Sequence, residues 1–300
     1  MTTRKLLFVP DGNWYAHRAL HTLNSSRPME DVLPYKLIDM FVKDAMLLRA
    51  THILCAFDGP KNFRKDLYPD YKANREGKVG NGDEYGDQTE SAKDKLYACF
   101  PALFERLAYF GIPFYQPRKH EADDVLCSIA HGVHDRMKFV GGTQDKDAYQ
   151  YLLWDSVRLV DTSNASKDKP ARWITRQIAE KKKGVTAEQM IDFQTLIGDK
   201  LDNIIGIPGM GPATAKAILT KHGSLKKWFA SGEDKELIAT NKERMRLNRK
   251  LVTLSTEVMP PGEIDDWKLS KFKARGADKL SRNYHELHNL MWPKSRGLFG

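Results

Sequence analysis

Short apolar runs alternate with helix-forming stretches over the first half of the chain. An apolar run that ends in a turn predicts a buried strand, and this pattern occurs at 6–12, 51–59, 110–117, the start of 137–152, and 156–162. Helical patterns lie between these runs, at about 36–48 and 93–107 and directly after residue 121. This alternation predicts an α/β fold with a mostly parallel central sheet flanked by helices.

The alternation gives way to helices near residue 185. Thr186 and Gln189 form a capping-box pattern, which marks the start of a helix, and 233–257 is a later helical and basic stretch. We therefore expect an α/β core at 1–184 and a helical region at 185–300. The sequence assigns no role to its last part, from residue 259 onward.

One long insertion interrupts the expected core at about 60–107. Its first part, 60–92, is polar and rich in lysine and glycine, and its loosest stretch is "GKVGNGDEYGD". The second part has a helical pattern near 93–107. We interpret this stretch as a long mobile insertion.

Acidic residues follow the predicted strands. Asp11, Asp58, Asp145 and Asp147 come just after apolar runs, and an acidic cluster at 121–124 follows another run by a few residues. A single aspartate at a strand end is usually a turn residue, and acids also suit the N-terminus of a helix. Carboxyl ends of parallel strands meet at one edge of a sheet, so four such places favour a shared acidic site.

Composition and charge narrow the class of protein. The chain has 300 residues, of which 41% are hydrophobic, so it can bury a sizeable core. No apolar run approaches the length of a membrane span, and the N-terminal residues contain no signal-peptide hydrophobic region. Three cysteines without a CxxC pair argue against a zinc site or disulfide framework and fit a reducing cytoplasm.

The net charge of +9 points toward a polyanionic partner, although many basic proteins have none. Basic residues concentrate at 61–78 and 167–183. Because a purely electrostatic DNA binder has no use for acidic clusters, basic stretches beside acidic ones favour metal-dependent chemistry on a phosphate backbone.

The segment "IPGMGPATAKAI" is the most specific local motif. Gly209 and Gly211 permit a tight turn, and the N–H groups at the start of the following helix can hold a phosphate without reading a base. A packing turn is the alternative. Asp199 and Asp202 precede this turn, and their i, i+3 spacing places them on one face if their segment is helical.

The acids together predict a metal site. If they converge, cations must offset their repulsion, and oxygen ligands favour Mg²⁺ or Mn²⁺, with two ions suited to phosphodiester hydrolysis. The candidate ligands are Asp11, Asp58, Glu121, Asp123, Asp124, Asp145, Asp147, Asp199 and Asp202.

The ordered motifs "VPDG", "AFDG", "YKANR", "EADD", "TQDKD" and "GDKLDNIIGIPGMGPATA" resemble the flap endonuclease / 5′→3′ exonuclease family, whose members include the 5′ nuclease domain of bacterial DNA polymerase I and free-standing bacteriophage enzymes. The resemblance covers roughly 5 to 256. It implies a PIN-like core with an acidic site at one sheet edge and a helical arch over that site. It also implies a helix–three-turn–helix that grips duplex DNA, often with a bound K⁺.

The resemblance assigns roles to individual residues. Asp145 is implied near both metal ions, with Asp124 behind the ligands. Lys72 and Arg75 are implied to stabilise charge on the scissile phosphate, and Tyr71 to stack on the terminal base; for the two cations a solvated basic face is the alternative. The implied DNA contacts are Arg64, Gly206, Gly209, Gly211, Thr214 and Lys216.

The resemblance implies a Mg²⁺-dependent 5′→3′ exonuclease and structure-specific flap endonuclease of replication or repair. Its substrates would be DNA with 5′ ends, flaps or nicks, and we expect a stand-alone monomer in the cytoplasm of a bacterium or phage-infected host. The alternatives are a non-catalytic structure-specific DNA-binding protein of the same fold and a ribonuclease that acts on RNA–DNA hybrid. Because the arch stretch is glycine-rich and acidic between Val79 and Asp94, the sequence leaves the threading of single strands open.

Overall fold

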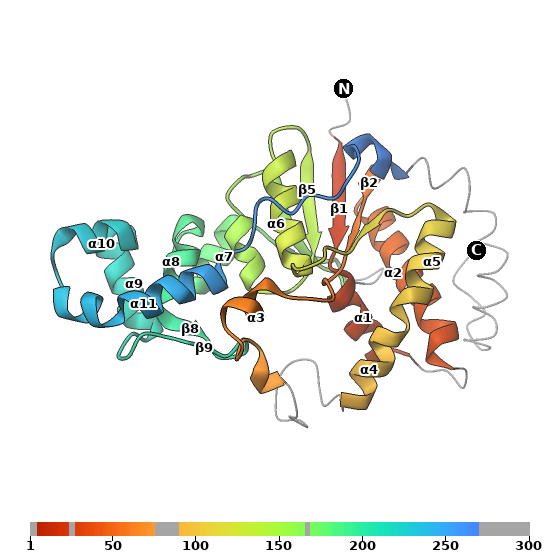
Figure 1. Ribbon diagram of the computed structural model, residues 1–300. Coiled ribbons are helices and arrows are strands. Elements are labelled where there is room, and N and C mark those ends of the chain that lie inside the picture. Colours follow the sequence, from red (N-terminus) through yellow and green to blue (C-terminus); the bar gives the residue numbers. More distant parts are fainter. Residues whose placement is uncertain (1–4, 24–27, 76–89, 166–168, 270–300) are drawn as a thin grey trace.

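A five-stranded sheet forms the centre of the computed structural model, which describes residues 5–23, 28–75, 90–165 and 169–269. The strand order is β2-β1-β5-β6-β7. The strands are β1 (Leu6–Pro10), β2 (His52–Ile53), β5 (Lys138–Gly142), β6 (Val157–Asp161) and β7 (Arg172–Ile174). Strands β1, β2, β5 and β6 run parallel to one another, whereas the edge strand β7 runs antiparallel to β6. The predicted α/β fold with a mostly parallel sheet is confirmed (Figure 1).

The strand expected within 51–59 is split at Leu54. Its first part, β2, pairs with β1, whereas its second part, β3 (Cys55–Ala56), pairs in parallel with β4 (Phe114–Tyr115). Asp11 forms a parallel bridge with Ala56, so the end of β1 lies beside β3. The strand expected at 110–117 is shorter than predicted, because Phe110 ends helix α5 and Gly111 caps that helix with a positive φ of 67°.

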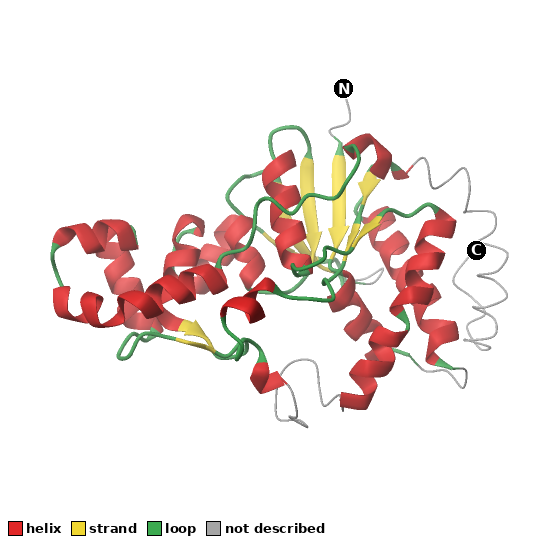
Figure 2. Ribbon diagram, in the orientation of Figure 1, coloured by secondary structure: helices red, strands yellow, loops and turns green. Residues whose placement is uncertain are grey.

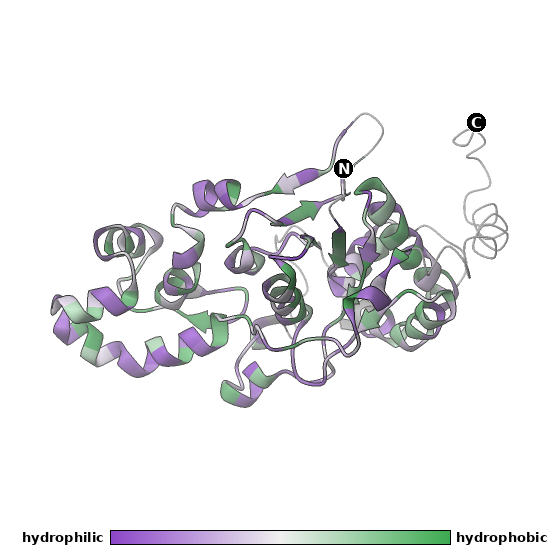
Figure 3. Cartoon of the chain, turned by 90° about the horizontal axis from the view of Figure 1, so that it is seen from above, coloured by the Kyte–Doolittle hydropathy of each residue, from purple (hydrophilic) through white to green (hydrophobic). Residues whose placement is uncertain are grey.

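Both faces of the sheet are covered, which explains why its strands are almost continuously apolar. Leu7 and Val9 of β1 face one core and Phe8 faces the other, as alternation along a strand requires. One face packs against α1 (Gly12–His21), α2 (Met29–Leu47), α4 (Glu90–Ala98) and α5 (Phe100–Phe110). The other face packs against α6 (Ala122–Val133), and the 3₁₀ helix η2 (Asp147–Tyr151) and α8 (Met190–Ile197) belong to the same apolar core, where α8 contacts η2. Figure 3 shows the central strands mainly in green and both colours on the surrounding helices.

Helix α2 begins well before the expected start near residue 36. It starts at Met29 and includes Pro34. A proline normally signals a helix boundary because it lacks an N–H and clashes with the preceding turn, so the local pattern hid the first two turns. Burial of Leu33, Leu37 and Phe41 in the core on this face of the sheet compensates for the missing hydrogen bond.

The chain from Arg176 to Val252 is mostly helical and forms one end of the molecule (Figures 1 and 2), and the described residues after it return to the sheet, where η4 (Ile264–Trp267) lies beside β2. The helical elements of this end are α7 (Arg176–Lys183), η3 (Ala187–Gln189), α8, α9 (Pro212–His222), α10 (Leu225–Ser231) and α11 (Lys235–Val252). The capping box of Thr186 and Gln189 is present. A short antiparallel hairpin of β8 (Gly198–Asp199) and β9 (Ile204–Ile205) separates α8 from α9. The segment that contains Asp199 and Asp202 is therefore a hairpin and not a helix, so their i, i+3 spacing does not place them on one helix face.

The expected insertion is only partly described. Helix α3 (Phe63–Leu67) and the short η1 (Ala73–Arg75) follow β3, and α4 and α5 lead back to the sheet. Residues 76–89, which include most of the expected glycine-rich arch, lie outside the described residues, as does the question of threading. Within the described part of the chain, none of the helices has the length and apolar character that crossing a membrane requires.

Candidate active site

The first carboxylates of the site follow β1 and β3. Asp11 directly follows β1 and caps helix α1, because its Oδ1 accepts hydrogen bonds from the backbone N–H groups of Asn13 and Trp14 at 3.0 Å. Asp58 follows β3, and its Oδ1 accepts from the backbone N–H of Ala122 at 2.8 Å. These contacts join the ends of two strands to the N-termini of α1 and α6. Strand-end aspartates thus reach one edge of the sheet, as their sequence positions indicated.

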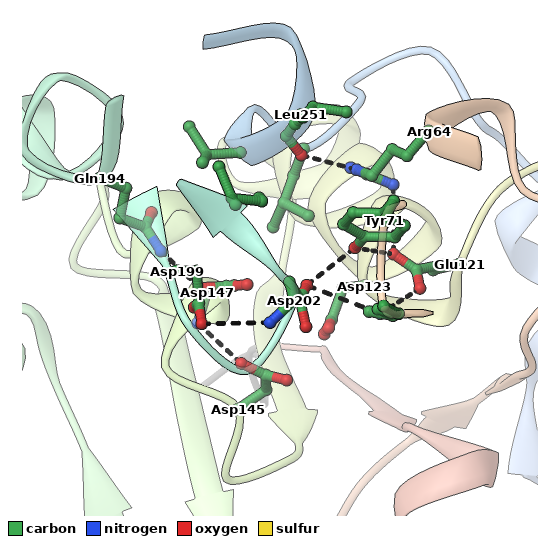
Figure 4. Close-up of a pocket in the computed structure, with 14 residues that line it drawn as sticks. Arg64, Tyr71, Glu121, Asp123, Asp145, Asp147, Gln194, Asp199, Asp202 and Leu251 are labelled. Atoms are coloured by element: carbon green, nitrogen blue, oxygen red, sulfur yellow. Dashed lines mark hydrogen bonds and ion pairs between the residues drawn. The ribbon is translucent and has the colours of Figure 1, made fainter. Parts of the chain in front are cut away.

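Helix α6 begins inside the acidic cluster. Glu121 is its N-cap and forms a capping box with Asp124, whose Oδ2 accepts from the Glu121 backbone N–H at 3.1 Å. Asp123 points toward the carboxylates from the strand ends, and Figure 4 shows it near the centre of the site. The N-terminus of a helix favours negative charge, so these acids suit the start of α6. The same cluster also contributes carboxylates to the acidic site.

Two more groups of acids complete the site. Asp145 follows β5, and its Oδ1 accepts from the backbone N–H of Asp147 at 2.9 Å. Asp199 lies on β8, and its Oδ1 accepts from the backbone N–H of Leu201 at 2.8 Å. Asp202 comes from the turn between β8 and β9. Figure 4 shows these side chains together with Glu121 and Asp123 around one pocket, although their elements are far apart in sequence.

The carboxylates raise one another's pKa values, and burial contributes most. Burial, followed by the charge of Asp58, raises the pKa of Asp11 to about 8. Burial and the neighbouring Asp145 raise the pKa values of both Asp123 and Asp147 well above the usual range. Burial and Asp202 also raise the pKa of Asp199. The site therefore disfavours its own negative charge and would gain from bound cations.

Lys72 lies among these carboxylates. Its Nζ forms an ion pair with Glu121 Oε1 and lies 3.7 Å from Asp202 Oδ2. Its backbone has a positive φ of 59°, a conformation that is costly for a residue with a side chain. The backbone N–H of Lys72 donates to the carbonyl oxygen of Asp202 at 2.9 Å, which holds this turn against the hairpin. The "YKANR" motif therefore reaches the acidic site.

Tyr71 is buried, with 2% of its surface exposed. Its hydroxyl oxygen lies 2.8 Å from Asp202 Oδ2 and 3.0 Å from Glu121 Oε2, and its single proton is shared between these two acceptors. Burial and these two carboxylates raise the pKa of Tyr71, so its hydroxyl keeps its proton and can donate a hydrogen bond. The expectation that Tyr71 stacks on a DNA base is corrected, because a ring enclosed by protein offers no face to a base. The tyrosine instead orients two acids of the site.

The structure also corrects the expected DNA contact of Arg64 and the expected metal-ligand role of Asp124. Arg64 is 1% exposed and Asp124 is fully buried, and they form two hydrogen bonds of 2.7 and 2.8 Å. Although burial alone would raise the pKa of Asp124, the bonds from Arg64 lower it. With both oxygens bound to the guanidinium, Asp124 is a partner of Arg64 rather than a metal ligand. Because Arg64 is enclosed, it does not form the expected DNA-facing cation. The side chain of Arg75 lies outside the described part of the structure.

The arrangement fits divalent cations in its chemistry. All the converging ligand atoms are carboxylate oxygens, which hard cations prefer, and the buried Oδ1 of Asp123 has no hydrogen-bond partner. Among the described residues, no three acidic, histidine or cysteine side chains are close enough to hold an ion without adjustment. Lys72 supplies positive charge between Glu121 and Asp202 in this arrangement.

The glycine-rich turn before α9 has the exposure that backbone contact with a phosphate needs. Gly209 has a φ of 74°, and both it and Gly211 face open space, while Thr214 is exposed on the first turn of α9. Gly206 is different: a side chain there would meet the carbonyl oxygen of Ile197 at 2.3 Å. Its small size is thus required for packing of the hairpin on α8. Lys216 is half-buried on α9.

Sequence patterns missed two side chains that border the acids. Gln194 of α8 lines the site and donates to Asp147 Oδ1. Lys183, at the end of α7, lies with its Nζ 5.9 Å from the centre of the Tyr149 ring, and burial lowers its pKa. The only signal for Gln194 is a polar residue within the apolar stretch "IDFQTLI", and that signal does not reveal its partner.

Comparisons with known proteins identify one family along most of the chain. The family described as "5'-3' exonuclease, N-terminal resolvase-like domain" matches residues 6–184, and "5'-3' exonuclease, C-terminal SAM fold" matches 185–275. The chain is 30% identical to a 5′-3′ exonuclease of Aquifex aeolicus, over 94% of this chain and 92% of that protein. It is 32% identical to DNA polymerase I of Rhizobium leguminosarum over 86% of this chain, but it spans only 25% of that longer protein.

Solved structures show the same fold. A structure of the bacteriophage T5 5′-exonuclease with bound zinc ions has a TM-score of 0.67 and 22% identity, and the match covers 96% of this chain and all of that one. The two family matches are contiguous and together extend over most of the chain, from its first strand to beyond the last described residue. This protein is therefore a member of the 5′-3′ exonuclease family of nucleases.

Proposed function

We propose that this 5′ nuclease hydrolyses phosphodiester bonds of DNA near 5′ ends, flaps and nicks, and that it uses two divalent ions, Mg²⁺ or Mn²⁺. The convergence of acids from strand ends, helix α6 and the β8–β9 hairpin is the observation that carries this proposal. The T5 structures supply further support: one holds divalent zinc, and another is a complex of T5 flap endonuclease with DNA and metal ions.

Two overlapping sets of acids would hold the ions. We assign Asp11, Asp58, Glu121, Asp123 and Asp145 to the first ion, and Asp145, Asp147, Asp199 and Asp202 to the second. Asp58 and Asp145 raise the pKa of Asp11, and Asp145, Asp202 and Asp199 raise the pKa of Asp147, so Asp145 lies close to members of both sets. When bound, such ions would offset charge that develops on the phosphate and make water a better nucleophile at neutral pH.

The chain's own side chains would orient and stabilise the reacting groups. Tyr71 holds Glu121 and Asp202 through its hydroxyl, which limits the rotation of both acids. The Lys72 ammonium shares the same two acids in this structure. Once cations neutralise those acids, Lys72 is positioned to donate to an oxygen of the scissile phosphate, as a fixed positive charge does in phosphoryl transfer. Arg75 remains a candidate for the same role by its place in the motif.

The turn at Gly209 and Gly211 and the start of α9 would hold the backbone of duplex DNA. Their exposure supports this role, because the N-terminus of a helix offers unsatisfied N–H groups to a phosphate. Thr214 and Lys216 would add side-chain contacts, and a K⁺ ion at this turn belongs to the proposal. We assign the α/β nuclease core to 1–184 and a helical DNA-binding region to 185–300, with Asp199 and Asp202 of the second region completing the acidic site. An RNA–DNA hybrid is a further substrate to test.

The protein would act as a monomer in the cytoplasm. Cys55, Cys99 and Cys127 are buried and form no disulfide, which fits a reducing compartment.

Cleavage assays on defined substrates test the proposal. A 5′-labelled flap duplex, a nicked duplex and an RNA–DNA hybrid would each be incubated with Mg²⁺, with Mn²⁺ or with EDTA. We expect short 5′ products from the DNA substrates only when a divalent ion is present. Tight binding without products under either ion would instead favour a non-catalytic DNA-binding protein, and preferred cleavage of the hybrid would favour a ribonuclease.

A further inference from the structure

A glutamine from the helical region holds one of the acids of the site. Nε2 of Gln194, on α8, donates to Oδ1 of Asp147, on η2 (Figure 4). Gln194 is only 5% exposed, so the contact is protected from water. The two residues are 47 positions apart and belong to different parts of the chain. The contact therefore links α8 directly to an acid from the sheet edge.

A second buried glutamine sets the orientation of the first. Nε2 of Gln150 donates to the carbonyl oxygen of Val252 at 2.7 Å, and its Oε1 accepts from the backbone N–H of Leu254 at 3.3 Å. A carbonyl only accepts and an N–H only donates, so the Gln150 amide has a single satisfied orientation. Its Nε2 also donates to Gln194 Oε1 at 2.9 Å. Gln194 must therefore turn its own Nε2 toward Asp147.

We propose that Gln194 is a positioning residue for the divalent-ion site, and that Gln150 and the backbone at Val252–Leu254 orient it. By fixing Oδ1 of Asp147, the Gln194 amide restricts the rotation of this carboxylate and leaves Oδ2 to an ion. Hydrogen bonds to the ligands of a metal commonly change its affinity by about 10- to 100-fold. This inference rests on the proposed function, because it concerns ions at the same acids.

The same short backbone segment also supports the opposite side of the site. The Arg64 Nε donates to the carbonyl oxygen of Leu251 at 2.8 Å, and the backbone N–H of Ser255 donates to Asp124 Oδ1 at 2.9 Å. Residues 251–255 directly follow or end α11, which packs on α8. The end of α11 thus contacts supports of both groups of acids, and the Gln150–Gln194 pair is its route to Asp147.

Removal of the Gln194 amide tests the inference without DNA. Gln194→Met keeps the length of the side chain, and Mn²⁺ affinity would be measured by calorimetric titration. We expect Mn²⁺ to bind about 10-fold more weakly. In cleavage assays, kcat should be lower at low Mg²⁺ and recover at high Mg²⁺, while KM for DNA stays unchanged.

Gln189→Met is the matched control, because the Gln189 amide donates to the carbonyl oxygens of Leu219 and Gly223 instead, at 3.0 Å. Its Mn²⁺ affinity should equal that of the wild type.

A double mutant distinguishes orientation from packing. Gln150→Met should weaken Mn²⁺ binding by a smaller factor, and Gln150→Met with Gln194→Met should be no weaker than Gln194→Met alone, because both act on Asp147 by one route. Unchanged Mn²⁺ affinity in folded Gln194→Met would overturn the inference, and so would fully additive losses. If thermal unfolding in EDTA shows that Gln194→Met does not fold, unchanged affinity in Gln150→Met overturns it. A wild type that binds no Mn²⁺ would refute the proposed function itself.

Discussion

The guanidinium of Arg64 and the carboxylate of Asp124 form a buried pair with two hydrogen bonds, of 2.7 and 2.8 Å. Arg64 follows β3 on helix α3, and Asp124 lies in the first turn of α6, directly beside the acids of the site. The pair neutralises one acid of the "EADD" motif and fixes the start of α6. Its burial makes it a structural element whose loss should affect the whole fold.

Arg64→Met should strongly destabilise the protein. The change leaves the Asp124 charge buried without its partner, which typically costs about 3–5 kcal/mol of the free energy of unfolding. Urea denaturation in EDTA, followed by circular dichroism, measures this cost. Lys119→Met is the control, because its ion pair with Asp66 is exposed and should contribute less than about 1 kcal/mol. Equal stability of the two variants would contradict the structural role of the pair.

Asp145→Asn should abolish cleavage and leave DNA binding intact or tighter. The asparagine keeps the Oδ1 that accepts from the Asp147 N–H, but it removes the charge that both proposed ion sites share. We expect the cleavage rate to fall by at least about 100-fold, as when another fixed electrostatic group is lost from an active site. Single-turnover cleavage and a gel-shift titration with the flap duplex measure the two effects. Joint loss of binding and cleavage would argue against this role.

The metal-free protein should lose stability as the pH rises toward 8. Burial and Asp58 raise the pKa of Asp11 from 3.8 in an unfolded chain to about 8, so the folded state holds a proton that the unfolded state releases. The free energy of unfolding therefore falls across this pH range. Divalent ions should raise the melting temperature more at pH 8 than at pH 5, because they bind the deprotonated acids. Thermal unfolding with EDTA or with Mg²⁺ measures both trends.

Asp11→Asn provides the matched test of that pH dependence. Asparagine is an equally good N-cap and can still accept from Asn13 and Trp14. Without a carboxyl at this position, the metal-free variant should exceed the wild type in stability at pH 8 by more than about 1 kcal/mol. The difference should shrink at pH 4. If the variant and the wild type lose stability equally as the pH rises, Asp11 is not a main cause of that loss.

DNA binding should weaken steeply with salt, and Lys216 should contribute to the slope. Phosphate contacts release counterions, so each one adds close to one unit to the slope of log Kd against log salt concentration. Lys216→Ala should lower that slope by about 1 and weaken binding similarly for all duplex sequences. Fluorescence anisotropy between low and moderate salt measures it. Lys119→Ala, in the exposed pair with Asp66, is the control and should keep the wild-type slope.

The local sequence pattern was sufficient for most of the fold. Strands β1, β5 and β6 lie where apolar runs end in turns, and α6 begins at the expected acidic N-terminus. The pattern failed where nonlocal packing overrides a local signal. Helix α2 includes Pro34 because its apolar face is buried on the sheet, and the edge strand splits at Leu54 because its two parts have different partners.

The sequence by itself determined that acids follow several parallel strands, and parallel strands bring their carboxyl ends to one edge for purely geometric reasons. Only the tertiary structure decided which acids face the site and which serve other side chains. Asp124 turns to Arg64, 60 positions away, and Gln194 turns to Asp147, 47 positions away. Neighbouring residues on one motif diverge in this way because burial forces each polar group to find a hydrogen-bond partner, and those partners come from distant segments that no local pattern specifies.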